Sequence, residues 1–340
     1  MSGTAQSPML TVEDVSVEFT ARVGRKRVPF RAVNEVGLTV GRGETLAVVG
    51  ESGSGKSTLA RAVLRLLPLA QGRVVVDGVD VTSLKGRALR QARRQAQMVF
   101  QDPYSSLDPS STIANIVGEP LRTHHGLRGA PLTDKVRELL VSVGLHPDYV
   151  NRYVHEFSGG QRQRLAIARA IALDPGLVVL DEAVSALDMS TQNQILDLLM
   201  DLQARHGMSY LFISHNLAVV RWIADRTAVM YLGRVLEEGP GKRIHDHPAH
   251  PYTQSLLSAV PVPDPPTQRT RQRIVLRGET PDPLHVPSGC AFRTRCPYAM
   301  EICALEEPPA VPVEGGGWAA CHLLTGAASP SAPEKSLAVG

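Results

Sequence analysis

Residues 50–58 read Gly-Glu-Ser-Gly-Ser-Gly-Lys-Ser-Thr, and this stretch carries the strongest structural signal in the chain. It fits the phosphate-binding pattern of a glycine, four variable residues and then Gly-Lys-Ser. The apolar run Thr45–Val49 leads into it, and Lys56–Leu67 follows with helical spacing before Pro68. Glycines let backbone N–H groups converge on an anion, and the start of a helix adds a favourable dipole. The residues expected to hold the phosphates are Gly50, Glu51, Ser52, Gly53, Ser54, Gly55, Lys56, Ser57 and Thr58.

A phosphate loop of this kind needs carboxylates, because Mg²⁺ and the attacking water both have to be held. Residues 177–182 read Leu-Val-Val-Leu-Asp-Glu, which predicts a buried strand with Asp181 at its carboxyl end. We expect Lys56 to neutralise the β- and γ-phosphates of ATP, and Ser57 and Asp181 to hold Mg²⁺. Glu182 is then placed to polarise the attacking water.

A second helix start able to receive an anion follows Phe157. Ser158, Gly159, Gly160 and Gln161 open a helical pattern that runs to Leu173. Simple N-capping would explain this stretch alone. Two anion sites in one small ATPase, however, indicate that one of them serves a neighbouring subunit.

The composition argues against several other classes of protein. The 340 residues carry a net charge of +3, which is too small to argue for nucleic acid as a partner. No run approaches the roughly 20 apolar residues of a membrane helix, and the N-terminus lacks a basic-then-apolar signal pattern. We expect a soluble, cytoplasmic chain, so any work at a membrane requires a partner that spans it.

Strands alternate with helical segments over residues 1–240, which predicts an α/β fold with a mainly parallel sheet covered on both faces. Prolines become dense after about residue 240 and periodicity is lost, so we expect a separate extension over 241–322 and a disordered tail over 323–340. Helix is expected over most of 110–173 and over 189–205. The expected strands are 9–19, 37–49, 73–77, 97–101, 177–181, 210–214, 227–232 and 234–237.

These motifs together resemble the ATP-binding cassette (ABC) family over roughly residues 9–240. Ser158–Gln161 resembles the family's signature sequence, and Gln101 resembles its glutamine loop. Ser185-Ala-Leu-Asp188 is similar to the loop after the second acidic motif, and His215 to the switch histidine. Phe19 resembles the aromatic residue that stacks on adenine. The resemblance implies a P-loop NTPase (RecA-like) cassette with a helical subdomain at about 102–173.

The resemblance also implies how these residues work. Two subunits would pair head to tail and enclose two ATP molecules, each held by one phosphate loop and by Ser158–Gln161 of the other subunit. Asp188 would lie in the loop at the dimer interface. His215 would contact the γ-phosphate and orient Glu182. Gln101 would sense Mg²⁺ and link the ATP site to the membrane partner.

Other stretches resemble the ATPase subunits of oligopeptide and dipeptide importers. These are 101–109, 155–164 and His250-Pro-Tyr-Thr-Gln-Ser-Leu-Leu257, with the cysteine-containing extension. Val154 departs from a common Pro, and Ala183-Val184 departs from a common Pro-Thr, but neither change removes a catalytic group. Nickel and other small-solute importers share these patterns, so they stay open as alternatives. A soluble, non-transport ABC ATPase is the rival from another class, although this chain has neither a second cassette nor a coiled-coil insertion.

For an importer, the resemblance implies ATP hydrolysis to ADP and phosphate at the cytoplasmic face of the membrane, with peripheral attachment. The implied partners are two membrane-spanning permease subunits, a second ABC ATPase subunit (the same chain or a related one) and an extracytoplasmic substrate-binding protein.

All four cysteines lie in the extension, at Cys290, Cys296, Cys303 and Cys321. A cytosolic chain disfavours structural disulfides, so the clustering indicates metal or cluster ligation. Zinc sites more often pair cysteines two to four residues apart, whereas these wider gaps suit an iron–sulfur cluster better. The family resemblance also implies a [4Fe–4S] cluster here. Zinc and free thiols remain the alternatives.

Overall fold

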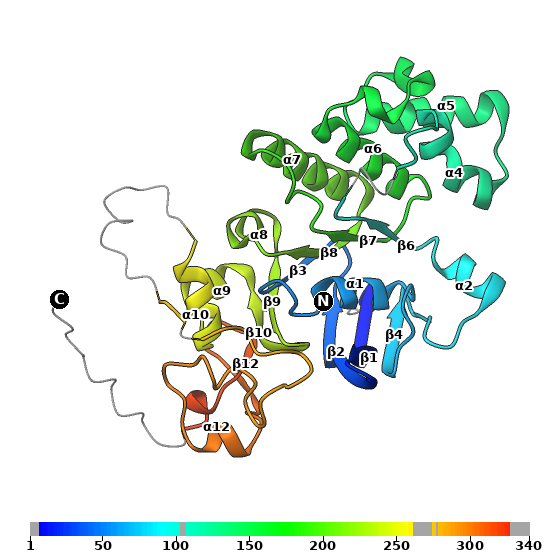
Figure 1. Ribbon diagram of the computed structural model, residues 1–340. Helices are drawn as coiled ribbons and strands as arrows, with labels where there is room; N and C mark the ends of the chain where they lie inside the picture. Colours follow the sequence, from blue (N-terminus) through cyan, green and yellow to red (C-terminus); the bar gives the residue numbers. More distant parts are fainter. Residues whose placement is uncertain (1–6, 103–106, 261–273, 277, 327–340) are drawn as a thin grey trace, which may run out of the picture.

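The structure, a computed structural model, describes residues 7–102, 107–260, 274–276 and 278–326. Its main sheet has eight strands in the order β11-β12-β10-β9-β3-β8-β7-β6, of which β9, β3, β8, β7 and β6 run parallel (Figure 1). The parallel strands are β3 (Thr45–Val49), β6 (Ala96–Val99), β7 (Leu177–Asp181), β8 (Ser209–Ser214) and β9 (Arg226–Tyr231). Every residue of β3, β7 and β8 is buried, as expected for parallel strands covered on both faces.

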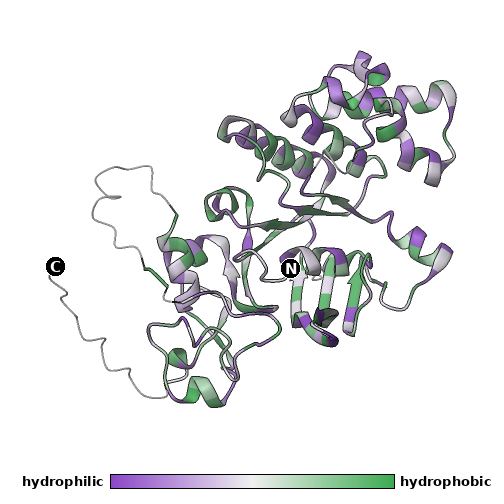
Figure 2. Cartoon of the chain, viewed as in Figure 1, coloured by the Kyte–Doolittle hydropathy of each residue, from purple (hydrophilic) through white to green (hydrophobic). Residues whose placement is uncertain are grey.

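The two faces of the main sheet belong to two different cores. On β3, Leu46 and Val48 pack in one core with helix α1 (Lys56–Val63). Ala47 and Val49 face the other core, which also holds α7 (Met189–His206). The prediction of a parallel sheet covered on both faces is therefore confirmed (Figures 1 and 2).

A second, antiparallel sheet packs on the α1 side and was not expected from the sequence. Its strands, in the order β2-β1-β4-β5, are β1 (Leu10–Val23), β2 (Lys26–Val40), β4 (Gln71–Val76) and β5 (Val79–Asp80). The single strand predicted over 37–49 is wrong. The chain turns at residues 41–44, where the Glu44 carboxylate accepts a hydrogen bond from the Gly41 amide, so β2 and β3 enter different sheets.

Helix α1 is shorter than its apolar spacing predicts. It ends at Val63, and Arg65 takes a left-handed φ of 55°. The Leu66 amide then donates to the Arg61 carbonyl, 2.9 Å away, which closes the last turn. The chain then forms β4 and β5 before helix α2 (Gly86–Ala92), which directly precedes β6 in the sequence.

Three helices form a lobe beyond β6 and β7, as predicted for the helical part of the chain (Figure 1). They are α4 (Ile113–His125), α5 (Gly129–Ser142) and α6 (Gly159–Ile171), with 3₁₀ turns at Pro147–Asn151 and Val154–Glu156. Ile113, Leu121 and Leu140 are fully buried between them. Residues 103–106, within the breaker-rich segment expected at this junction, lie outside the described residues.

The extension continues the main sheet instead of standing apart from it. Strand β10 (Arg234–Pro240) pairs with β9 on one side and, through Glu237 and Glu238, with β12 (Trp318–Ala320) on the other. The remaining elements are α8 (Leu217–Ile223), α9 (Gly241–Asp246), α10 (Pro251–Ser258), α12 (Ile302–Leu305), β11 (Ala310–Pro312) and a 3₁₀ turn at His322–Leu324.

The expected tail over 323–340 is described only as far as residue 326, and residues 327–340 lie outside the described residues. Among the helices that the structure describes, none is both long and apolar enough to cross a bilayer.

Candidate active site

The phosphate loop connects the end of β3 to the start of α1, as the sequence predicts. Two of its glycines are required by close approach of other backbone. A Cβ on Gly50, whose φ is 156°, would lie 2.1 Å from the Met230 carbonyl oxygen. A Cβ on Gly55, with φ of 103°, would lie 2.2 Å from the Ala32 carbonyl oxygen.

Lys56 is buried beneath the loop. Its Nζ donates to the Gly50 carbonyl at 2.8 Å and the Glu51 carbonyl at 2.9 Å, and lies 3.4 Å from Ser54 Oγ. Burial lowers its pKa, and the nearby charges of Glu182, Asp181 and Glu51 oppose that shift. A cation held only by neutral oxygens is ready to exchange them for phosphate oxygens.

Asp181 ends β7 directly under the first turn of α1. Its Oδ1 accepts a hydrogen bond from Ser57 Oγ at 2.7 Å, whereas Oδ2 is buried and has no hydrogen-bond partner among the described residues. Burial raises the pKa of this carboxyl, and the Ser57 hydrogen bond opposes the shift. A buried carboxylate oxygen without a partner, beside a hydroxyl, fits a Mg²⁺ site, because hard cations prefer such oxygen ligands.

Glu182 joins the other two predicted catalytic side chains. Gln101 Nε2 donates to its Oε2 at 2.9 Å, and His215 Nδ1 lies 3.2 Å from its Oε1. Glu182 has a left-handed φ of 49°, an uncommon conformation for a residue with a side chain. Its side chain is 13% exposed, so water can reach a base that is otherwise enclosed.

Lys56, Gln101, Glu182 and His215 line one cavity of about 510 Å³ at the mouth of the phosphate loop, whereas Asp181 lies behind Ser57 and does not line it. The lining residues are Ala32, Ser52, Gly53, Gly55, Lys56, Ser57, Thr58, Gln101, Glu182 and His215. Ala32 was not anticipated, because only the fold brings β2 against the loop. The arrangement can bind a polyphosphate and present one water to a carboxylate.

Several other predicted site residues do not line this cavity. Phe19 lies on β1, 37% exposed, with its ring centroid 6.0 Å from that of Phe30. Glu51 belongs to the loop, but its side chain binds Arg295 of the extension, a contact with no signal in the sequence. The Gly50 carbonyl and the Ser54 hydroxyl instead contact Lys56 Nζ on the buried side of the loop.

The second helix start is built as an N-cap within this chain. Ser158 Oγ accepts from the Gln161 amide at 3.4 Å, and the Gln161 side chain accepts from the Ser158 amide at 3.0 Å. Asp188 caps α7, where it accepts from the Thr191 amide at 3.0 Å and the Thr191 hydroxyl at 2.7 Å. The side chains of Ser158 and Asp188 are exposed, and neither residue lines the cavity of its own chain.

The four cysteines come together in the extension, and none forms a disulfide. Burial raises the pKa of Cys296 to about 12 and of Cys321 to about 11, and neighbouring cysteine charges add to both shifts. The amides of Phe292, Tyr298 and Leu323, each two residues after a cysteine, donate hydrogen bonds to the sulfurs of Cys290, Cys296 and Cys321.

In the part of the chain that the structure covers, no group of three or more His, Cys, Asp or Glu side chains is arranged to hold a metal ion. The four sulfurs therefore do not surround a single ion, as a tetrahedral zinc site requires.

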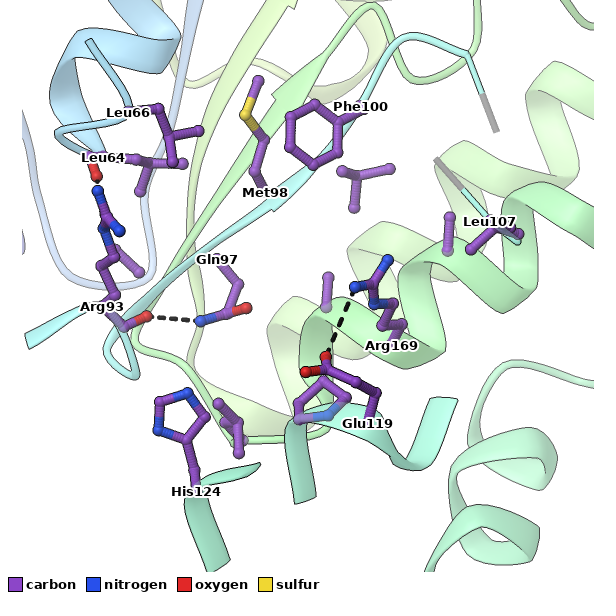
Figure 3. A pocket seen from close by; sticks show the side chains of 16 residues that line it. Leu64, Leu66, Arg93, Gln97, Met98, Phe100, Leu107, Glu119, His124 and Arg169 are labelled. Atoms are coloured by element: carbon purple, nitrogen blue, oxygen red, sulfur yellow. Dashed lines mark hydrogen bonds and ion pairs between the residues drawn. The ribbon is translucent and has the colours of Figure 1, made fainter. Parts of the chain in front are cut away.

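A second cavity, of about 210 Å³, opens between β6 and the helical lobe, directly before Gln101 (Figure 3). Leu64, Leu66, Met98 and Phe100 form an apolar side. On the opposite side, Arg169 pairs with Glu119 at 3.5 Å. We call this cavity the lobe groove.

Comparisons with known proteins agree with this geometry. Residues 33–185 match the ABC transporter family, and residues 236–303 match the oligopeptide/dipeptide transporter C-terminal region. The probable peptide ABC transporter ATP-binding protein y4tS of Sinorhizobium fredii is 50% identical over 333 residues, which cover 97% of this chain and 94% of y4tS. The oligopeptide transport ATP-binding protein AppF of Bacillus subtilis is 46% identical over 329 residues, covering 96% of this chain and 100% of AppF.

Solved structures with the same fold are ATP-binding cassettes. The dimeric cassette MJ0796, in a post-hydrolysis state bound to ADP and Pi, superposes with a TM-score of 0.61 at 29% identity, covering 68% of this chain and 98% of that one. The cbiO1 protein of Clostridium perfringens, part of the transporter complex cbiONQ, has a TM-score of 0.61 at 25% identity, covering 71% of this chain and 92% of that one. The chain therefore belongs to the ATP-binding proteins of ABC transporters, in the group that carries the oligopeptide/dipeptide transporter C-terminal region.

Proposed function

We propose that this protein is the ATP-hydrolysing subunit of an importer for oligopeptides or dipeptides. The observation that carries the ATPase part is Glu182, held between Gln101 and His215 at the mouth of the phosphate loop. The transport part is supported by the match to the oligopeptide/dipeptide transporter C-terminal region and by relatives named for peptide transport.

The hydrolysis step follows from the site. Glu182 accepts a proton from water as the water oxygen forms a bond to the γ-phosphorus, and the bond from that phosphorus to the β–γ bridging oxygen breaks. ADP and phosphate leave. Lys56 neutralises the charge that develops on the β- and γ-oxygens, and His215 keeps Glu182 oriented. Ser57, Asp181 and Gln101 would hold Mg²⁺, which supplies Lewis-acid stabilisation of the phosphate oxygens when bound.

A complete site requires a second subunit in this proposal. The cavity lacks any group from Ser158–Gln161, although that capped helix start has amides suited to an anion. We propose that Ser158, Gly159, Gly160 and Gln161 contact ATP bound to the partner, that Asp188 lies at the interface, and that Phe19 stacks on adenine. The partner ATPase is either a second copy or a related chain.

We propose that a segment of a permease binds in the lobe groove. It is apolar on one side, and it ends at Phe100, which is 39% exposed and directly precedes Gln101. A segment seated there would move Gln101 relative to Glu182. Attachment through this groove to two permeases would place the chain peripherally on the cytoplasmic face of the membrane, with an extracytoplasmic binding protein delivering the peptide.

The first test is a pull-down from native membranes with Glu182→Gln protein and ATP. We expect two multi-span permeases, a second cassette ATPase and a peptide-binding protein to co-purify. Ribosomal or DNA-repair partners without a permease would overturn the transport proposal, and a nickel-binding protein in place of a peptide-binding one would overturn the substrate class.

The groove has its own test in Leu66→Asp, because Leu66 is 45% exposed and lines the groove but not the phosphate-loop cavity. The variant should hydrolyse ATP alone at the wild-type rate yet lose the permeases in the pull-down. Val141→Asp on α5 is the matched control, since Val141 is 58% exposed and does not line the groove. Retention of permeases by Leu66→Asp would rule the groove out.

The [4Fe–4S] cluster on Cys290, Cys296, Cys303 and Cys321 is a separate proposal, supported by the buried thiols and their amide donors. Anaerobically purified protein should contain about four irons per chain. Its visible absorption spectrum should show the sulfur-to-iron charge-transfer bands of such clusters. Zinc in place of iron would show that the cysteines bind zinc instead of a cluster. Protein with neither metal would rule out metal ligation by these cysteines.

A further inference from the structure

Glu51 turns its side chain away from the phosphates. Although it is the second residue of the phosphate loop, it does not line the cavity. Both of its carboxylate oxygens bind the extension. Arg295 Nη1 lies 2.7 Å from Oε2, Arg295 Nη2 lies 3.1 Å from Oε1, and Thr280 Oγ1 donates to Oε2 at 3.0 Å.

The backbone of Glu51 makes two further contacts. Its amide donates to the Tyr252 hydroxyl at 3.0 Å, and its carbonyl accepts from Lys56 Nζ at 2.9 Å. One loop residue therefore joins the lysine that binds phosphate to three groups that lie more than 200 positions later in the chain.

Two of the groups that hold Glu51, the Arg295 and Tyr252 side chains, are largely buried and have further partners. The Arg295 side chain is only 10% exposed, and its backbone amide donates to the Phe292 carbonyl at 3.0 Å. Tyr252 packs against Tyr231 and Phe292 with ring centroids 4.7 and 5.3 Å apart. Arg295 directly precedes Cys296, so the Glu51–Arg295 pair joins the phosphate loop to the segment that carries the cysteines.

We infer that Arg295 is a positioning residue for ATP binding, through which the extension holds the phosphate loop in its binding conformation. A bidentate pair between a guanidinium and a carboxylate fixes both distance and orientation, which a single charge contact does not. Without it, the loop would have to be ordered when the nucleotide binds, and that ordering costs affinity. This inference concerns nucleotide binding by the chain alone and is independent of any permease.

The test is ATP affinity of the purified full chain, measured with a fluorescent, non-hydrolysable ATP analogue. Arg295→Ala should raise the Kd about tenfold, equivalent to about 1.4 kcal/mol, because the bidentate pair that holds Glu51 is lost. The rate at saturating ATP should fall by a smaller factor, because Glu182 is untouched. Arg295→Lys keeps the charge but cannot donate two parallel hydrogen bonds to the Glu51 carboxylate. Its Kd should therefore lie between those of Arg295→Ala and the wild type.

Arg293→Ala is the matched control. Arg293 lies two residues away and is half-buried, and among the described residues its guanidinium donates hydrogen bonds to the Ser288 carbonyl and hydroxyl. It should keep wild-type affinity. Wild-type Kd in folded Arg295→Ala, or in Arg295→Lys if the alanine variant does not fold, would overturn the inference.

A double-mutant cycle distinguishes positioning from general loosening. Glu51→Ala and Arg295→Ala act through the same contact, so the double variant should bind ATP about as weakly as the weaker single variant. Effects that multiply in the double variant would show that the two residues act separately and would also overturn the inference.

Discussion

Single side chains account for most of the chemistry. Glu182 accepts a hydrogen bond from Gln101 and contacts His215, while the neighbouring Asp181 is buried under Ser57. Two adjacent carboxylates thus have different surroundings, which suit different roles. The buried one suits a cation, and the one that water can reach suits a base.

Replacing the base should separate binding from hydrolysis. Glu182→Gln keeps the shape of the side chain but cannot accept a proton, so steady-state hydrolysis should fall by at least about 100-fold. ATP binding should persist, and the proposed dimer should accumulate, as measured by size-exclusion chromatography with ATP. Wild-type turnover in this variant would show that another group is the base.

Lys56 has the opposite expected signature. Its ammonium is the buried cation of the loop, so Lys56→Ala should weaken ATP binding by roughly 10- to 100-fold, the equivalent of a charged hydrogen bond. Equilibrium binding of a non-hydrolysable analogue measures this directly. Unchanged affinity would contradict its phosphate role.

Secondary-structure elements place these side chains, and their ends matter most. At the start of α6, a Cβ on Gly160 would lie 2.5 Å from Thr191 Cγ2 on α7. Thr191 cannot easily turn away, because its hydroxyl is bound to Asp188 at 2.7 Å. The helix start and the Asp188 cap therefore pack against each other through a glycine.

This packing gives a matched pair of variants. Gly160→Ala should lower the free energy of unfolding by about 1–3 kcal/mol, the usual cost of overpacking. Gly159→Ala should not, because its Cβ would meet Leu187 at an ordinary 3.7 Å. Chemical denaturation of each purified chain measures the difference, and equal stability of the two variants would contradict the packing argument.

Helix α10 carries a pH-sensitive cap. His250 Nδ1 accepts from the Tyr252 amide at 3.0 Å, and burial lowers the pKa of His250 to about 4. Unfolded, it would titrate near 6.5, so between these values the unfolded state binds the extra proton. Stability of the fold should therefore decrease as pH falls from about 6.5 toward 4.

His250→Asn tests the origin of that slope, since asparagine is a good N-cap and does not titrate. Thermal melting across this pH range should show a shallower decline for the variant than for the wild type. An unchanged slope would assign the acid sensitivity to other groups.

At the level of the whole molecule, the extension completes the structure around the loop. Strand β12 lengthens the main sheet at β10, and Cys290 and Cys303 pack into the same core as Tyr231 and Tyr252. The thiols and the ATP site are thus parts of one folded unit, connected through Glu51 and Arg295.

Cys296→Ser should act mainly on the extension. The substitution places a hydroxyl where a partly buried thiol packs, so amide hydrogen exchange over residues 290–321 should rise. ATP affinity should change less than in Arg295→Ala. An equal loss of affinity in the two variants would show that the cysteines, and not only Arg295, determine how tightly the phosphate loop binds ATP.

The residue pattern was sufficient to predict the parallel strands, the phosphate loop and the grouping of Lys56, Asp181 and Glu182, because these depend on local signals. Glycines, buried β runs and terminal carboxylates have the same meaning wherever they occur. Strand lengths near residues 37–49 and the end of α1 were mispredicted, because apolar spacing does not show where a turn closes.

Contacts between distant segments required the folded chain. The antiparallel sheet, the addition of β12 to β10, Ala32 at the cavity and the Glu51–Arg295 pair join residues far apart in sequence. In the sequence, nothing about Arg295 beside Cys296 identifies Glu51 as its partner. Such pairings follow from which surfaces the two cores bring together, and that is a property of packing rather than of any local run of residues.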